Sequence, residues 1–185
     1  LLFLIGGFLV MWMAAGFAML ETGLVRSKNA STQLLKNVAL FSLASIAYFI
    51  VGFNLMYPGD GWIIDGWMGG FSLTGLEPAG VGADGVDLTY ASVGSDFFFQ
   101  LMFCAATASI VSGTVAERVK LWPFLIFTIV LTGIFYPISA SWQWGGGWLS
   151  EAGFSDFAGS TVVHATGAAA ALAGAMVIGA RHGRY

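Results

Sequence analysis

Long uncharged stretches alternate with short charged segments along this chain. Five intervals without Asp, Glu, Lys or Arg are rich in apolar residues: 1–20, 38–57, 97–116, 121–141 and 157–180. A helix needs about 20 apolar residues to cross the hydrocarbon core of a bilayer, so each interval predicts one spanning helix. Residues 1–20 could instead be a secretory signal, but the run has no basic n-region and no small-residue cleavage site. The pattern predicts an all-α polytopic membrane protein with five transmembrane helices.

The fourth and fifth spans differ in composition from the others. The uncharged stretch 121–150 is too long for one straight helix, and Pro137 and the glycines from Gly145 to Gly147 interrupt it. We therefore expect a helix that ends at about 141, followed by a buried loop. The fifth span is rich in Ala and Gly, which allow helices to approach closely in lipid, so we expect it at the centre of the bundle.

The charged segments predict the orientation of these helices. The basic residues follow the first, third and fifth spans. They are Arg26, Lys28, Lys36, Arg118, Lys120, Arg181 and Arg184. The loop 58–96 and the turn 150–156 carry only acidic charges: Asp60, Asp65, Glu77, Asp84, Asp87, Asp96, Glu151 and Asp156. Since basic loops favour the cytoplasm, we expect the N-terminus and the acidic loops outside a cell membrane. The acidic outer loop either attracts cations or is a solvated loop with interfacial aromatic residues.

Composition excludes several classes of protein. Apolar residues make up 57% of the 185 residues and charged residues 9%, which is too few charges for the surface of a soluble domain. A formal net charge of -3 and this hydrophobicity also exclude a disordered chain and a nucleic-acid binder. The single Cys104 cannot form an intrachain disulfide. Because the chain starts inside an apolar run and ends after a basic cluster, we expect it to be part of a longer protein.

Polar groups at membrane depth are costly and are therefore candidates for function. His164 lies eight residues after Asp156, which places it about 12 Å along the fifth helix. A pore-lining or proton-handling role is one interpretation, and a core histidine bonded to a carbonyl is the other. Haem ligation is a third, but His182 lies at the end of the helix and cannot share that depth. For Asp156 we expect a helix cap, which is compatible with attraction of a cation.

Aromatic residues near the outer ends of the third and fourth spans are ambiguous. Trp144 precedes the glycine run, where an indole can either mark the membrane interface or attract a small cation. Phe103 in the third span is either packing or part of a gate. Glu21 and Glu117 lie near the inner helix ends, close in sequence to Arg26 and Arg118, and we expect interfacial ion pairs there. The chain has no phosphate loop, no HExxH and no nucleophile elbow, so we expect no enzyme, cofactor or metal site.

Four segments resemble the ammonium transporter (Amt/Rhesus) family, on the Amt side. They are residues 15–29 (AGFAMLETGLVRSKN), 111–118 (VSGTVAER), 144–148 (WGGGW) and 156–164 (DFAGSTVVH), and the last is the most diagnostic. The resemblance runs through all five spans, although loop residues 59–94 are not matched in detail. It implies that residues 1–185 are a partial ammonium transporter domain, the first half of an eleven-helix inverted-repeat fold.

The resemblance also implies a mechanism and partners. Ammonium or its analogue methylammonium would be recruited by Trp144 with support from Asp156, pass a gate that includes Phe103, and meet His164 as the first of two pore histidines. Ammonia would be conducted with or without the proton, in a homotrimer among membrane lipids that serves nitrogen uptake and meets a PII-type regulator at the cytoplasmic face. Residues 165–168 (ATGA) depart from the Ile-Asn-Ala of many transporters. They leave open an ammonium sensor of the same fold, coupled to a C-terminal signalling domain.

Overall fold

The computed structural model describes residues 1–73 and 91–183. Five helical segments in this part are long and apolar enough to cross a membrane: Leu2–Leu24, Ser27–Met56, Val93–Thr114, Leu121–Ser141 and Ser160–Ile178. The predicted all-α fold with five spanning helices is confirmed. Glu77, Asp84, Asp87 and Arg184 lie outside the described residues, so the expectations for them remain predictions.

Two helical segments contain several elements each. The second consists of η1 (Ser27–Asn29), α2 (Ala30–Ala47), η2 (Tyr48–Gly52) and α3 (Phe53–Met56). The fourth consists of α5 (Leu121–Val130), η3 (Leu131–Phe135) and α6 (Tyr136–Ser141). Both η2 and η3 are π-helical turns. Pro137 lies two residues after the end of η3. It has no N–H to donate, and its ring would crowd the carbonyl of the residue four positions earlier, which lies in η3. The widened π-helical turn accommodates both.

The remaining elements complete the bundle. Helix α1 (Leu2–Leu24) and helix α4 (Val93–Thr114) are continuous, whereas the last span begins with the π-helical turn η4 (Ser160–Ala165) and continues as α8 (Thr166–Ile178). A short helix α7 (Trp148–Glu151) and an antiparallel pair of strands, β1 (Trp62–Ile64) and β2 (Met68–Gly69), were not expected from the apolar pattern.

The second helix also begins earlier than its uncharged stretch, at Ser27 rather than at about residue 38. Residues 30–37 are helical although three of them, Gln33, Lys36 and Asn37, are polar and buried. Each of these side chains has a hydrogen-bond partner inside the bundle, so burial leaves the donors satisfied.

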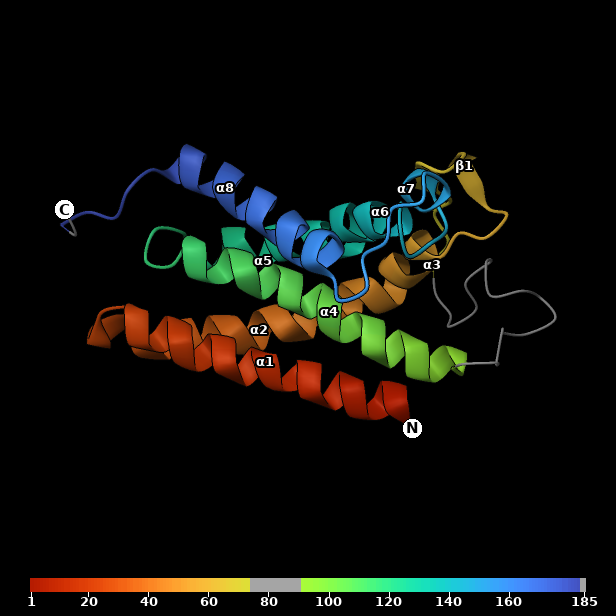
Figure 1. Ribbon diagram of the computed structural model, residues 1–185. Helices are drawn as coiled ribbons and strands as arrows, with labels where there is room; N and C mark the ends of the chain where they lie inside the picture. The colour runs from red at the N-terminus through yellow and green to blue at the C-terminus, as the bar shows by residue number, and fades with distance from the viewer. Residues whose placement is uncertain (74–90, 184–185) are drawn as a thin grey trace.

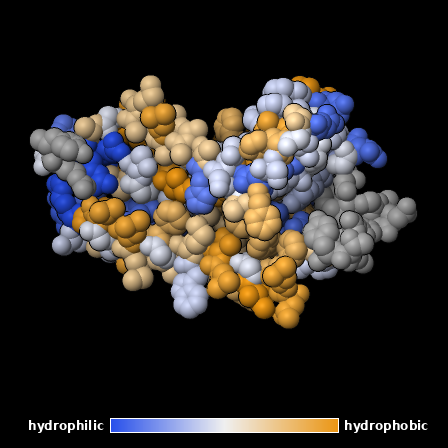
Figure 2. Space-filling model, in the orientation of Figure 1, coloured by the Kyte–Doolittle hydropathy of each residue, from blue (hydrophilic) through white to orange (hydrophobic). Residues whose placement is uncertain are grey.

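The bundle has two chemically different ends. The turn between α1 and α2, the loop between α4 and α5 and the end of α8 lie together (Figure 1, left), and the N-terminus, β1 and α7 lie at the opposite end. We call the first the basic end, because it carries Arg26, Lys28, Arg118, Lys120 and Arg181. The other is the acidic end, with Asp60, Asp65, Glu151 and Asp156. Figure 2 shows strongly hydrophilic residues gathered mainly towards the two ends, with hydrophobic residues over much of the surface between them.

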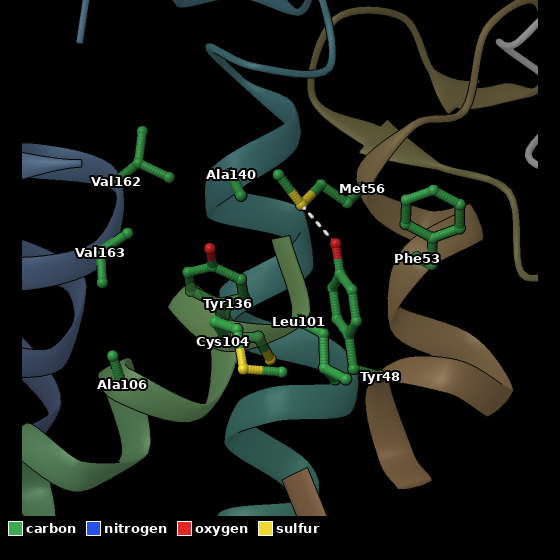
Figure 3. Packing of buried hydrophobic residues seen from close by; sticks show 11 residues of the cluster. Tyr48, Phe53, Met56, Leu101, Cys104, Ala106, Tyr136, Ala140, Val162 and Val163 are labelled. Carbon is green, nitrogen blue, oxygen red and sulfur yellow. Dashed lines mark hydrogen bonds between the residues drawn. The ribbon is translucent and has the colours of Figure 1, made fainter. Parts of the chain in front are cut away.

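The core near the acidic end joins four of the spans. Tyr48 and Tyr136 are fully buried there with Cys104, and Val163 of η4 packs against the same cluster (Figure 3). The Tyr48 hydroxyl donates to the Met56 sulfur at 3.0 Å, which satisfies a polar group inside the apolar cluster. This core fixes the end of α6 against the start of the last span, the two elements that carry the candidate site.

Candidate functional site at the acidic end

Asp156 caps the last span. Its Oδ1 accepts from the backbone N–H groups of Gly159 and Ser160 at 2.8 and 3.0 Å, and its Oδ2 accepts from those of Thr161 and Val162, both at 2.8 Å. These are the N–H groups that a helix start leaves without partners. The cap expected from the sequence is therefore present, and both carboxylate oxygens are occupied by it.

The electrostatics of Asp156 follow from these contacts. Burial favours the neutral acid and works to raise the pKa of the carboxyl, which is only 7% exposed. The four backbone N–H bonds outweigh burial and hold the pKa below the ordinary value for Asp. Asp156 is therefore a fixed negative charge just before the helix that carries His164.

Trp144 is positioned by the same turn. Its indole N–H donates to the backbone carbonyl of Asp156 at 2.8 Å. Gly159 has a left-handed φ of 81°, and a Cβ there would lie 3.2 Å from the Trp144 ring, so glycine fits this position for two reasons. The loop after Trp144 is equally close-packed: a Cβ on Gly145 would lie 2.2 Å from the Met56 carbonyl oxygen.

The third element of the site is the aromatic row on α4. The Phe103 ring lies 5.9 Å from the Trp144 ring at an interplanar angle of 63°. Phe99, one turn earlier, lies 4.9 Å from Phe103 in an edge-to-face arrangement. Phe103 and Trp144 are both half-buried. The sequence-predicted residues Phe103, Trp144 and Asp156 are thus brought together, although they come from three separate segments.

A cavity of about 580 Å³ opens beside this group. Its wall includes Phe103, Trp144 and Phe99, together with the start of α1. Two polar side chains of α4, Asp96 and Gln100, also line it, whereas Asp156 does not. The sequence analysis assigned Asp96 to the acidic loop and did not identify Asp96 and Gln100 as site residues. Their spacing of four residues could have indicated the pair, because it places two side chains on one face of a helix.

His164 lies deeper in the last span, within the π-helical turn η4. It is exposed, on a face that the described residues leave uncovered. No hydrogen bond joins its ring to another residue in 1–73 or 91–183. The described part of the chain therefore does not contain the carbonyl partner that a satisfied core histidine would need.

The expectation of an interfacial ion pair at Glu21 is wrong. Glu21 is 2% exposed, and its Oε2 accepts from the side chains of Gln33, Asn37 and Ser112. The distances are 2.8 Å for Asn37 and 2.7 Å for Ser112. Lys36 lies beside this group and donates to the Ser112 carbonyl at 2.8 Å. Glu21 thus joins α1 to α2 and α4 inside the bundle, away from Arg26.

Glu117 does form ion pairs, but with residues far away in the sequence. Its Oε1 lies 3.8 Å from the Arg26 Nε, and its Oε2 lies 3.5 Å from Arg181. Bonds from the Arg26 backbone N–H and the Asn29 amide hold the pKa of Glu117 below its ordinary value. The neighbouring Arg118 instead donates to the carbonyls of Gly179 and Thr114. These contacts join the three loops of the basic end.

Comparison with known proteins gives one consistent family. The model of the Ammonium Transporter Family matches residues 1–185. The chain is 44% identical over 192 residues to the ammonium transporter Amt2 of Archaeoglobus fulgidus, an alignment that covers 98% of the chain and 38% of that relative. It is 36% identical over 176 residues to the ammonium transporter of Bacillus subtilis, with 94% of the chain and 42% of the relative covered. The chain therefore spans about two fifths of the length of these relatives.

Solved structures agree with the sequence relatives. The chain is similar to a protein described as a sensor Amt protein, with a TM-score of 0.85 and 35% identity over 99% of the chain and 44% of that protein. It is also similar to Mep2 of Saccharomyces cerevisiae, with a TM-score of 0.81 and 26% identity over 96% of the chain and 38% of Mep2. The arrangement of five helices is thus found as part of larger proteins.

Proposed function

Because the chain belongs to the ammonium transporter family, we propose that it supplies part of a pathway that carries ammonium or ammonia across a membrane. The resemblance seen in the four sequence segments is confirmed by the family match. The relatives are named as transporters rather than enzymes, as expected. The single observation that carries the proposal is the grouping of Trp144, Phe103 and Asp156 at the acidic end, where Asp156 caps the span that contains His164.

In the proposed mechanism, ammonium arrives from the acidic end. The faces of Trp144 and Phe103 attract the cation, each such contact contributing about 0.5–2 kcal/mol depending on desolvation. Asp156 supports the site in two ways: it fixes the Trp144 indole through its carbonyl, and its carboxylate adds a negative charge nearby. Phe103 separates this outer position from the deeper part of the pathway and acts as a gate.

Passage of the intact ion would be expensive. The Born cost of moving an ion into a low-dielectric pore is on the order of 20 kcal/mol, far more than one aromatic contact returns. Loss of the proton removes most of that cost. A neutral imidazole has one donor and one acceptor nitrogen, so His164 can accept or pass the proton or hold ammonia.

The charge distribution supports a direction for the pathway. We infer that the basic end faces the cytoplasm and the acidic end faces outwards, because short basic loops favour the cytoplasmic side. For the same reason, we infer that the Glu117 contacts, and any PII-type regulator, lie on the cytoplasmic face. From the family resemblance, we also propose that the protein forms a homotrimer in the cell membrane.

A sensor of the same fold is the second candidate. The similarity to the protein described as a sensor Amt protein, at 35% identity, supports it, as does the sequence ATGA after His164. In that case ammonium would occupy the same outer position, and its occupancy would be read by a signalling domain.

The test compares wild type and His164→Ala at full length in sealed vesicles, with methylammonium uptake and current recorded together. We expect wild-type uptake without potassium current. We expect His164→Ala to abolish uptake or to convert it to passage of the intact ion, which responds to voltage by about 2.3 kcal/mol per charge per 100 mV and admits potassium. Wild-type rate, selectivity and current in the mutant would make His164 a structural residue. Ammonium binding without any uptake by the wild type would favour the sensor.

A further inference from the structure

The cavity at the acidic end is lined by side chains of two different chemistries. Phe99, Phe103 and Trp144 form an aromatic group, which we call the aromatic wall. Asp96 and Gln100, one turn apart on the same face of α4 as the two phenylalanines, add polar oxygens. The nearby carboxylate of Asp156 does not line the cavity, and its oxygens already accept four backbone bonds. A carboxylate available to a ligand in this cavity is therefore that of Asp96.

Asp96 and Gln100 are nearly buried. Each is 8% exposed. The side chains of Gln100 and Tyr57 lie close to the Asp96 carboxylate. The Gln100 side-chain oxygen has no hydrogen-bond partner among the described residues. A buried acceptor without a partner is costly, and such a group beside a cavity calls for a donor from a ligand or a water molecule.

We propose that Asp96 and Gln100 form an acceptor wall that selects cations able to donate N–H bonds at the outer site. The ligand class is ammonium and its small primary-amine analogues. This inference rests on the proposed function, because it assigns a substrate-selecting role within the same site. Asp96 supplies charge and a carboxylate acceptor, and Gln100 supplies a neutral acceptor one turn further along α4.

The two walls contribute differently to selectivity. The aromatic wall attracts any small cation, including a quaternary ammonium ion that has no N–H. The acceptor wall adds hydrogen bonds only to a cation with N–H groups, and a charged partner strengthens such bonds. Removal of the acceptor wall should therefore weaken ammonium and methylammonium more than tetramethylammonium.

The experiment measures binding and uptake separately on the full-length protein. Binding of methylammonium and of tetramethylammonium is followed by calorimetry in detergent, and methylammonium uptake is followed in vesicles. Asp96→Asn keeps the shape and a hydrogen-bonding side chain, so it disturbs the fold little. We expect it to weaken methylammonium binding about tenfold, which corresponds to about 1.4 kcal/mol, and tetramethylammonium binding by less than threefold.

Asp60→Asn is the matched control, because it removes the same charge from the same end at an exposed position outside the cavity. We expect less than a twofold change from it. Gln100→Leu is a second variant that removes the unpartnered acceptor without a change in charge, and it should also weaken methylammonium more than tetramethylammonium. Thermal unfolding in detergent checks that each variant is folded.

The outcomes separate the two proposals. Methylammonium binding that depends on Asp96, without uptake, supports the acceptor wall and contradicts transport. Uptake with unchanged binding in Asp96→Asn and Gln100→Leu supports transport and overturns the acceptor wall. Two further results would also overturn the acceptor wall. One is an equal loss of methylammonium binding in Asp96→Asn and Asp60→Asn. The other is an equal loss of methylammonium and tetramethylammonium binding in Asp96→Asn, because Asp96 would then contribute only to the electrostatic potential of the acidic end. Absence of binding and uptake in the wild type overturns both.

Discussion

The buried carboxylates of Glu21, Asp96 and Asp156 differ in their surroundings and therefore in their structural roles. Among the described residues, Asp156 accepts hydrogen bonds only from backbone N–H groups three to six residues ahead. Within the same part of the chain, Glu21 accepts only from side chains of other helices, those of Gln33, Asn37 and Ser112. Asp96 lines a cavity. The first arrangement is local and stabilises a helix start, the second joins helices, and the third leaves a carboxylate at the wall of a cavity.

Removal of the Glu21 carboxylate should destabilise the bundle. Hydrogen bonds between membrane helices contribute about 0.6 kcal/mol each, so the loss of three in Glu21→Ala should lower the free energy of unfolding by about 2 kcal/mol. Glu151→Ala, at an exposed position, serves as the control and should change it by less than about 0.5 kcal/mol. Denaturant unfolding in detergent, followed by tryptophan fluorescence, measures both. Equal stability of the two variants would contradict the joining role of Glu21.

These residues also show what the sequence could predict about the site. The cap by Asp156 was predictable, because its partners follow within six residues. The burial of Glu21 was not, since its partners lie 12, 16 and 91 residues away. The proximity of Phe103 to Trp144 could be expected only from the family resemblance, because no local sequence pattern predicts that α4 packs against the loop after α6.

At the scale of elements, the loop after α6 depends on close backbone approach. Gly145 lies against the end of α3, and Gly147 lies against the strand connection, where a Cβ would be 2.6 Å from the Gly66 carbonyl oxygen. The apolar pattern predicted the fourth helix well, including its end near residue 141. It did not predict the start of the second helix, because the polar residues Gln33, Lys36 and Asn37 find partners that only the folded bundle provides.

Gly145→Ala should disturb the loop that holds Trp144. The new Cβ would lie 2.2 Å from the Met56 carbonyl oxygen and 2.8 Å from the Ser141 Cα, and neither backbone atom can move alone. Overpacking of this kind costs about 1–3 kcal/mol, and we expect weaker methylammonium binding as Trp144 is displaced. Gly94→Ala is the control, since nothing lies within 4 Å of its Cβ position. The free energy of unfolding and the affinity for methylammonium are measured for both variants. If Gly145→Ala matches Gly94→Ala in both quantities, the close packing at Gly145 is contradicted.

At the scale of the whole molecule, much of the apolar surface is left uncovered by the described residues. His164 is exposed, and so are apolar side chains along α1 such as Leu9, Trp12 and Leu20. The curated relatives are more than twice as long as the chain, which covers 38% of one and 42% of another. The proposed conduction path beside His164 would therefore need further protein to close it against lipid.

Residues 1–185 on their own should not conduct. A pathway open to lipid on one side cannot hold ammonium or water, and an ion exposed to hydrocarbon there would again meet a Born cost on the order of 20 kcal/mol. The measurement is methylammonium uptake into vesicles that contain the purified fragment at the same density as the full-length protein, with empty vesicles as the baseline. We expect the fragment to match empty vesicles while the full-length protein takes up methylammonium.

Uptake by the fragment that disappears in His164→Ala would contradict this, because the path would then be closed by the fragment itself or by copies of it. Uptake that His164→Ala leaves unchanged would be a leak unrelated to the proposed path.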